Sequence, residues 1–298
     1  MPALPATSAE NARGAAFMVV AMATFVVNDA LMKSLSGEVP VFQAVLVRGL
    51  FATLLIGAFA LARGEARLSA LPVRDRKLAA LRAAAEIGAT VCFLTALFAA
   101  PIATVTAILL ASPLVITLVG ATFLGEPVGW RRWSAVIVGF VGVLLIVKPG
   151  ADGFQPALLW AVASMFFVCL RDLITRRLSP ETPSMLITLM TASAITVTGA
   201  VVTFWEGWEP LSGSETLRLG AAAVFVFVGY LFSVMTMRVG DIGFVSPFRY
   251  TILIWALLIG VFVFGDRPGP VTLAGAALIV LSGVYTFHRE TRRVRQPR

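Results

Sequence analysis

The chain is a succession of apolar runs about 20 residues long, and short segments between them carry most of the charge. About 20 apolar residues is the length that an α-helix needs to cross the hydrocarbon core of a bilayer. The pattern therefore predicts an all-α integral membrane protein with ten transmembrane helices. The predicted spans are 13–34, 41–62, 78–99, 102–123, 131–148, 156–176, 183–205, 217–237, 243–264 and 270–288.

Polar residues interrupt two of these helices. Helix 78–99 is rich in Ala and contains Arg82 and Glu86, so its prediction rests on its length and flanking charges. In helix 102–123, Ser112 and Pro113 lie near the middle. Because Pro has no backbone N–H, it frees a carbonyl that needs another partner. We therefore predict a kink there that lines a cavity.

The sequence also repeats itself. A shift of 143 positions places Asp29, Leu35, Ser36, Glu38 and Pro40 on Asp172, Leu178, Ser179, Glu181 and Pro183. A shift of 140 positions places Gly120, Gly125 and Glu126 on Gly260, Gly265 and Asp266. Such repeats are typical of membrane carriers, in which two related halves move around one substrate site. We predict two five-helix repeats, residues 1–150 and 151–298, and the odd number makes the second repeat inverted relative to the first.

Composition excludes a soluble protein. Hydrophobic residues make up 58% of the chain, charged residues 13%, and the mean hydropathy is +0.90. The net charge of +8 could suggest a nucleic-acid partner, but such proteins gather Lys and Arg on one folded face. Here the basic residues lie between apolar runs, where they orient a membrane protein. With a cytoplasmic amino terminus, roughly 18 fall inside and only a few outside, so both termini are predicted to be cytoplasmic.

Two related motifs point to a family. Phe123-Leu-Gly-Glu126-Pro127 and Phe264-Gly-Asp266-Arg-Pro268 each precede a Gly-containing helix, and Pro247-Phe-Arg249-Tyr250 lies near the start of the ninth helix. An acid followed by Pro suits the start of a helix, so we interpret these turns as structural. With the duplicated layout, the chain resembles the ten-helix EamA carriers of the drug/metabolite transporter superfamily. The resemblance implies metabolite transport across a bacterial inner membrane, on a scaffold that serves amino acids, vitamins and other metabolites.

Ionisable residues within the predicted spans are the first candidates for a substrate site, because each is costly in lipid without a partner or water. Arg48 lies about 10 Å from the outer end of its helix, and Glu86 about 12 Å from the inner end of the next. We predict a contact between them, directly or through water. Two interpretations are open. The pair could only fix helix packing, or Arg48 could bind a substrate carboxylate while Glu86 carries a coupling proton.

The ninth helix supplies a second group of candidates. Arg249 has Ser246 and Tyr250 as helical neighbours, with Trp255 further along. A guanidinium, a hydroxyl, a phenol and an indole can together hold an amphipathic zwitterion or a planar ring. Alternatively, Arg249 extends to the cytoplasmic headgroups. Asn28 and Thr104 could add polar groups to the wall of the site, although such residues more often form interhelical hydrogen bonds.

The repeat also relates two acid and base pairs. Asp29 with Lys33, and Asp172 with Arg176, have the i and i+4 spacing that favours a pair on a helix. Because the copies are inverted, one pair is expected near each face, as two gates would be. The alternative is a pair of local ion pairs at the lipid interface, each worth a few tenths of a kcal/mol.

Enzymatic functions fit poorly. The single histidine, His288, lies at the end of the last helix, so it cannot build a His-based triad or a His-rich metal site in the bilayer. None of the three lysines lies in a phosphate-binding GxxxxGK[ST] motif. We expect no catalytic residue, metal or cofactor.

The sequence therefore favours a secondary carrier whose partners are a small-molecule substrate and membrane lipid, not nucleic acid. The leading interpretation is an exporter of aromatic and other neutral amino acids. The alternative is uptake of riboflavin, S-adenosylmethionine or a similar metabolite. A channel would want a continuous polar lining that this chain lacks. Monomer and homodimer both remain open.

Overall fold

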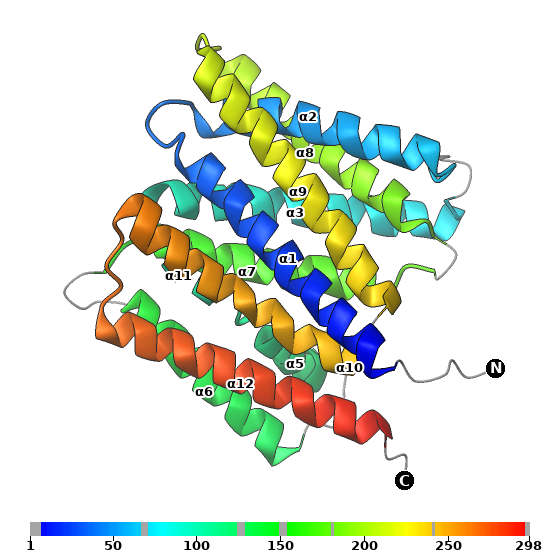
Figure 1. Ribbon diagram of the computed structural model, residues 1–298, viewed down its shortest axis with the longest axis vertical. Coiled ribbons are helices and arrows are strands. Elements are labelled where there is room, and N and C mark those ends of the chain that lie inside the picture. Colours follow the sequence, from blue (N-terminus) through cyan, green and yellow to red (C-terminus); the bar gives the residue numbers. More distant parts are fainter. Residues whose placement is uncertain are drawn as a thin grey trace. The chain divides into compact units, whose positions relative to one another are not determined.

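The computed structural model describes residues 7–66, 71–123, 129–148, 154–179, 182–239 and 242–295, and the regular elements within these ranges are all helices (Figure 1). In chain order they are α1 (Ser8–Lys33), α2 (Val41–Ala62), α3 (Val73–Ala99), α4 (Ile102–Leu109), α5 (Ser112–Phe123), α6 (Trp130–Val147), α7 (Ala157–Thr175), α8 (Ser184–Glu206), α9 (Gly213–Val239), α10 (Ile242–Val245), the 3₁₀ helix η2 (Ser246–Tyr250), α11 (Thr251–Phe264) and α12 (Pro270–Arg295).

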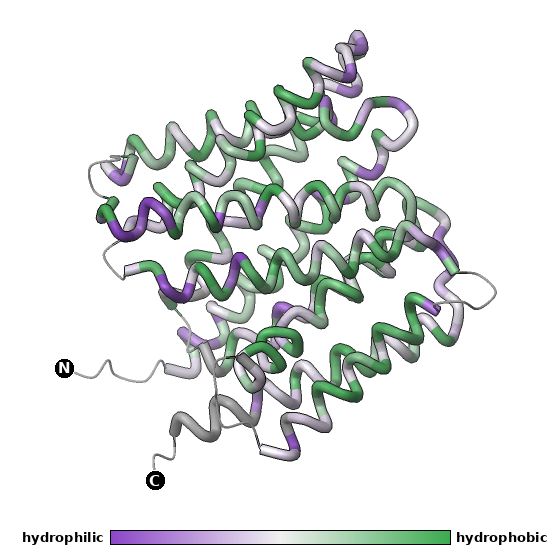
Figure 2. The backbone as a smooth tube through the Cα atoms, turned by 180° about the vertical axis from the view of Figure 1, so that it is seen from behind, coloured by the Kyte–Doolittle hydropathy of each residue, from purple (hydrophilic) through white to green (hydrophobic). Residues whose placement is uncertain are grey.

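These helices confirm the predicted membrane class. Among the described residues, eight helical spans are long and apolar enough to cross a membrane, and Trp133–Val147 and Pro270–Thr286 are shorter apolar helices. Apolar residues follow the lengths of the helices, whereas most hydrophilic ones lie toward their ends (Figure 2). The chain is an all-α membrane protein with ten transmembrane helices, of which the fourth is α4 with α5 and the ninth combines α10, η2 and α11.

Proline sets several of the helix starts. Pro40, Pro72, Pro101 and Pro183 occupy the N-cap positions of α2, α3, α4 and α8. Pro has no N–H to donate to a preceding turn, so it is tolerated at the start of a helix and not inside one. The apolar pattern and these prolines together explain why α2 begins and ends at the predicted residues, 41 and 62.

The chain forms two compact units, and each combines helices from both halves of the sequence. Unit 1 contains Met1–Val27, Pro101–Pro156 and Val228–Arg298, and unit 2 contains Asn28–Ala100 and Ala157–Phe227. Helices α1 and α9 each contribute to both units. The division into two compact units therefore reflects the packing of equivalent helices against each other, and not the boundary between the two repeats.

In unit 2, α2 packs against α8, its equivalent in the second repeat (Figure 1). The hydroxyls of Thr53 and Thr196, which are 143 positions apart, lie 3.1 Å from each other. Contacts run in opposite senses along the two helices, because Gly199 meets Leu46 whereas Gly57 meets Leu189. Two equivalent helices are thus antiparallel and meet at equivalent residues, which is the geometry of inverted repeats.

Unit 1 contains the matching contact between α6 and α12. A Cβ placed on Gly142 would lie 2.6 Å from the carbonyl oxygen of Gly275, and one placed on Gly275 would lie 2.7 Å from that of Gly142. Only glycine permits this approach, because neither backbone can move aside. Gly139 likewise contacts Leu114 and Ser282. The small residues of these helices are therefore used for packing within the chain.

Both the fourth and the ninth transmembrane helices are broken at a Ser-Pro sequence. The predicted kink at Ser112 and Pro113 is confirmed, since α4 ends at Leu109 and α5 begins at Ser112. The ninth helix covers the predicted residues 243–264, but residues 246–250 form a 3₁₀ turn that interrupts the α-helix before α11 begins at Thr251. Pro247 explains this break, as it cannot donate a helical hydrogen bond. Interrupted helices at matching places of two repeats are typical of carrier substrate sites.

Candidate functional site

Polar side chains gather in unit 2 at two places. The first, here called the α1–α2 cluster, consists of Asn28, Asp29 and Arg48. Arg48 Nη1 donates to Asn28 Oδ1 over 3.2 Å, and Asn28 Nδ2 donates to Asp29 Oδ1 over 2.9 Å. The Arg48 guanidinium is also close enough for its charge to act on Asp29. One cation and one anion therefore compensate each other, as charges within a span must.

The second place, the α3–α7 cluster, consists of Arg82 and Glu86 of α3 with Arg171 and Asp172 of α7. Arg171 Nη1 lies 3.1 Å from Glu86 Oε1 and 3.2 Å from Oε2, so it donates to both oxygens. Arg171 Nη2 lies 2.8 Å from Asp172 Oδ1, and Arg82 Nη2 lies 4.0 Å from Glu86. The cluster holds two cations and two anions and is therefore neutral overall.

The two clusters occupy related places in the repeat. The shift of 143 positions takes Asn28 and Asp29 to Arg171 and Asp172, and Arg48 to Thr191. Thr191 belongs to the second cluster through its hydroxyl, which accepts a hydrogen bond from Arg82 over 2.6 Å. Along their helices, Arg48 and Thr191 each precede the contact between Thr53 and Thr196 by about 7 Å. Since α2 and α8 are antiparallel, the clusters lie on opposite sides of that contact.

The predicted direct contact between Arg48 and Glu86 is wrong. Within the described chain, the ion-pair partners of Glu86 are Arg171 and Arg82. Arg48 instead lies beside Asn28. The geometry favours the packing interpretation for Glu86, because its carboxylate joins α3 to α7 between two guanidinium groups.

The predicted i and i+4 pairs have other partners in the structure. Asp29 accepts from Asn28, and Asp172 accepts from Arg171. Lys33 Nζ donates to the carbonyls of Leu97 and Ala100, over 2.9 and 2.5 Å. It thereby binds the last carbonyls of α3, where a cation is favourable. Arg176 is exposed. The predicted pairing is wrong, because tertiary contacts outcompete a local pair worth a few tenths of a kcal/mol.

Two loops are fastened to unit 2 by residues at equivalent positions. Asp75 Oδ2, at the start of α3, accepts from Ser179 N over 3.0 Å and from Thr182 Oγ1 over 2.5 Å. Arg218, which is the equivalent of Asp75 and lies in α9, donates to Ser34 and pairs with Glu38. Asp75 therefore holds the loop that follows α7, and Arg218 holds the loop that follows α1. These contacts fix the helix ends that carry the polar clusters.

Unit 1 contributes aromatic surface. Its aromatic cluster, Phe25, Phe232, Phe248 and Trp255, packs on the buried residues Met18, Ala21 and Met22. The cluster draws on α1, α9, η2 and α11. In the described chain, Trp255 Nε1 is buried and has no hydrogen-bond acceptor. A buried indole N–H without a partner loses free energy, so this position would gain from an acceptor on a ligand.

The remaining candidates of unit 1 are more dispersed. The Tyr250 hydroxyl packs against Gly283 of α12, so it is part of the helix packing. Arg249 is exposed, Ser246 begins η2, Ser112 begins α5, and Thr104 is buried in α4. The exposure of Arg249 favours its extension toward headgroups over a buried contact. Of these candidates, Trp255 has the surroundings of a ring-binding residue.

Sequence reasoning missed Arg171. The charge count treats it as one of the basic residues that flank a span, yet it lies inside α7 with its side chain 25% exposed. The repeat contains the signal that could have found it, since Arg171 precedes Asp172 as Asn28 precedes Asp29. The second repeat thus has a cation, Arg171, where the first has the amide of Asn28. An additional cation next to the repeated acid predicts a second acid nearby, and Glu86 is that acid.

The charged groups of the α1–α2 cluster suit the binding of a solute. Among the described residues there is no group of three or more His, Cys, Asp or Glu that could hold a metal ion. The α1–α2 cluster presents a cation beside an anion, which is the charge pattern that complements a zwitterion. The fold and these sites define a membrane carrier built from inverted repeats.

Comparison with known proteins identifies the family. The profile of the EamA-like transporter family matches residues 12–148 and again residues 155–287, and the chain belongs to this family. The Glu126 and Pro127 turn that suggested it lies outside the described residues, whereas Asp266 precedes α12 as expected. The chain is therefore a multi-pass membrane transporter, and its family members are transporters rather than enzymes.

Several named relatives align over most of the chain. An S-adenosylmethionine uptake transporter of Rickettsia prowazekii (strain Madrid E) is 23% identical over 282 residues, covering 94% of each chain. A riboflavin transporter of Vibrio cholerae is 32% identical over 193 residues, 64% of each chain. The pseudopaline exporter CntI of Pseudomonas aeruginosa is 25% identical over 273 residues, 90% of this chain and 94% of the exporter.

A solved crystal structure supports the fold alone. It superposes with a TM-score of 0.65 at 21% identity, covering 93% of this chain and 99% of the other. The same helical arrangement therefore extends over nearly the whole of both proteins.

Proposed function

We propose that this transporter takes up a cofactor-like metabolite and that S-adenosylmethionine is its substrate. The observation that carries the proposal is the alignment with an S-adenosylmethionine uptake transporter over 94% of both chains. The proposal places the protein in a bacterial inner membrane with both termini in the cytoplasm, following the distribution of Lys and Arg.

The α1–α2 cluster of unit 2 matches the amino-acid part of this substrate. Arg48 can bind the carboxylate, and Asp29 can accept from the ammonium group, as the five N–H donors of arginine and the oxygens of a carboxylate allow.

Two other substrates have specific support. Riboflavin is favoured by the 32% identity with a riboflavin transporter, but it lacks the carboxylate and the cations that the α1–α2 cluster would recognise. Export of amino acids is the leading interpretation of the sequence, and the relationship to a pseudopaline exporter favours the outward direction. None of the relatives named above is described as an amino-acid exporter, so the comparisons favour the cofactor-like substrate.

Counterflow into proteoliposomes tests the proposal. Vesicles preloaded with unlabelled S-adenosylmethionine are expected to accumulate labelled S-adenosylmethionine faster than empty vesicles, because a carrier exchanges solute at its site. Preloading with riboflavin or phenylalanine should give no such stimulation. In parallel assays in which the labelled and the preloaded compound are the same, counterflow of phenylalanine alone would establish the amino-acid carrier, and counterflow of riboflavin alone would establish the vitamin carrier. Equal fluxes with and without preloading would indicate a channel.

We further propose that Asp29 and Asp172 help to control access from opposite sides, each through the cluster that now contains it. Their support is their equivalent positions on either side of the contact between Thr53 and Thr196. Asp29→Asn and Asp172→Asn are expected to change the half-saturating substrate concentration on opposite faces of oriented proteoliposomes. The gating role would be excluded by two variants that retain wild-type values on both faces.

A further inference from the structure

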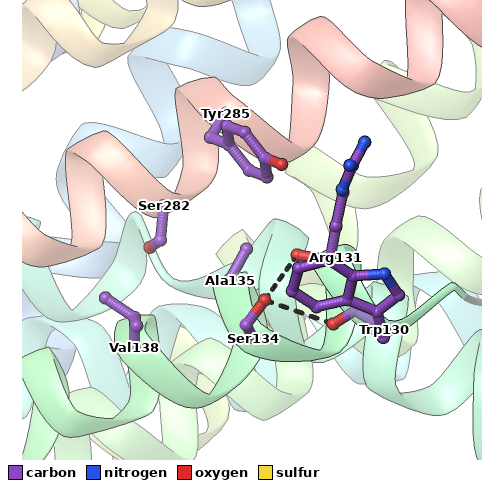
Figure 3. Close-up of a pocket in the computed structure, with 7 residues that line it drawn as sticks. All are labelled: Trp130, Arg131, Ser134, Ala135, Val138, Ser282 and Tyr285. Carbon is purple, nitrogen blue, oxygen red and sulfur yellow. Dashed lines mark hydrogen bonds between the residues drawn. The ribbon is translucent and has the colours of Figure 1, made fainter.

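A groove lies along the seam between α6 and α12, within unit 1 (Figure 3). Its volume is about 290 Å³, and it is lined by Trp130, Arg131, Ser134, Ala135, Val138, Ser282 and Tyr285. Ser282 and Tyr285 of α12 face Ala135 and Val138 of α6 across it, and Trp130 and Arg131 lie at one end (Figure 3). We propose that this groove binds one anionic phospholipid, with its phosphate at Arg131 and an acyl chain along Ala135 and Val138.

The apolar part of the groove suits a hydrocarbon chain. Ala135 is buried, whereas Val138 is 40% exposed, so the floor is closed and the side is open. The hydroxyls of the groove already have acceptors, since Ser134 donates to the carbonyls of Trp130 and Arg131, and Ser282 donates to that of Ile279. Because these hydroxyls already donate to backbone carbonyls, the lining has little need of a polar solute as a hydrogen-bond partner and is compatible with an alkyl chain.

The aromatic residues place one end of the groove at the membrane surface. Trp130 is 74% exposed and Tyr285 is 44% exposed. Trp and Tyr are enriched where headgroups meet the hydrocarbon, because their rings are apolar and carry a polar tip. A lipid in this groove would thus have its headgroup near Trp130 and Tyr285 and its tail along the seam.

Charge selects an anionic headgroup. The Arg131 guanidinium lies 5.3 Å from the centroid of the Trp130 ring. Within the described chain no carboxylate lies within ion-pair distance of it. Arg131 lies in the first turn of α6, beside Trp130 at one end of the groove (Figure 3). Basic pockets between membrane helices bind anionic lipid headgroups.

The backbone of α6 adds to this preference. Its N-cap is Gly129, which offers no side chain to the first N–H groups, and the first turn contains arginines and no acid. Cations are unfavourable at the positive end of a helix, so an anion there would relieve the repulsion. A second copy of the chain is a poorer occupant, because a symmetric contact at this seam would bring the two basic ends together.

Native mass spectrometry of the purified full chain tests the proposal, with phosphatidylglycerol and phosphatidylcholine of identical acyl chains as probes. We expect one phosphatidylglycerol to be retained in preference to phosphatidylcholine. Arg131→Gln should weaken phosphatidylglycerol binding roughly fivefold, which is what one arginine is worth at an anionic surface. The matched control is Arg63→Gln, because Arg63 also stacks on an aromatic ring, that of Phe59 at 5.2 Å, but does not line the groove.

A second variant tests where the acyl chain binds and leaves the charge of Arg131 unchanged. Val138→Trp should fill the groove and weaken binding of both lipids, while thermal unfolding shows that the fold persists. The proposal would be overturned if Arg131→Gln bound phosphatidylglycerol as the wild type does, or if Arg63→Gln lost as much binding as Arg131→Gln. It would also be overturned if Val138→Trp retained full lipid binding. Displacement of the lipid by soluble glycerol 3-phosphate at equal concentration, which would indicate a free-anion site, or a dimer that excludes lipid would overturn it as well.

Discussion

Replacing Arg171 by methionine is expected to lower the free energy of unfolding by about 3 kcal/mol. Arg171 separates two carboxylates, those of Glu86 and Asp172, at 3.1 and 2.8 Å. Removing one partner of a buried ion pair costs roughly 3–5 kcal/mol, because the remaining charge is left in a medium of low dielectric constant. The lower end applies here, since Arg82 stays 4.0 Å from Glu86 and Arg171 is itself 25% exposed.

Thermal unfolding in detergent, followed by tryptophan fluorescence, measures this effect. At this chain length about 3 kcal/mol corresponds to a fall in Tm of roughly 5 °C. Arg176→Met is the control, because Arg176 belongs to the same segment and is exposed, and it should change the free energy of unfolding by less than about 0.5 kcal/mol. Combining Arg171→Met with Glu86→Gln removes both charges and should restore much of the loss. A double variant no more stable than Arg171→Met would show that Arg171 acts through shape rather than charge.

The positions of the helices could be predicted because the hydrophobic pattern and the prolines report local physics. The limits of α2 agree with the prediction, since Pro40 fixes its start and the apolar run ends near Ala62. The fourth helix also breaks where Pro113 interrupts it. The 3₁₀ turn near the start of the ninth helix was not predicted, because Pro near the beginning of a helix is ordinarily tolerated. Here the chain forms a 3₁₀ turn through Tyr250 first.

The partners of the charged residues could not be predicted in the same way. Depth along neighbouring helices suggested that Arg48 meets Glu86, but depth does not say which helices share a face. The structure packs α3 on α7 and thereby gives Glu86 to Arg171. Similarly, spacing along one helix could not show that Lys33 reaches the carbonyls of Leu97 and Ala100. These are tertiary contacts. The repeat reduces the number of candidate partners for each charged residue but does not determine which partner it has.

The inverted repeat nevertheless explains why the two polar clusters differ in chemistry. Equivalent positions hold Asn28 in one copy and Arg171 in the other, while the neighbouring acids, Asp29 and Asp172, are retained. Arg171 has both acids of its own cluster as partners, and with Arg82 it ties α3 to α7. The α1–α2 cluster contains an amide in that place, so its cation, Arg48, comes from another helix. This difference supports our proposal that Arg48 recognises the substrate, whereas Arg171 joins helices of the scaffold.

Replacing Arg48 by glutamine is expected to reduce S-adenosylmethionine uptake roughly 10- to 150-fold at low substrate concentration, if that substrate is the one carried. A hydrogen bond to a charged group contributes about 1.5–3 kcal/mol, which corresponds to that range. Arg48→Lys should recover only part of the activity, because lysine cannot form the bidentate contact of a guanidinium with a carboxylate. Initial rates in proteoliposomes measure both effects. Arg63→Gln is the control on the same helical segment, since Arg63 lies at the exposed end of α2.

A substrate analogue separates recognition from structural damage. Decarboxylated S-adenosylmethionine lacks the group that Arg48 is proposed to bind, so the wild-type protein should take it up as poorly as Arg48→Gln takes up the parent compound. The variant should no longer distinguish the two compounds, because the contact is absent in both cases. If the variant discriminates between them as strongly as the wild type does, the carboxylate is bound elsewhere. Arg48 would then serve chiefly to compensate Asp29 and to hold Asn28 over the 3.2 Å hydrogen bond seen here.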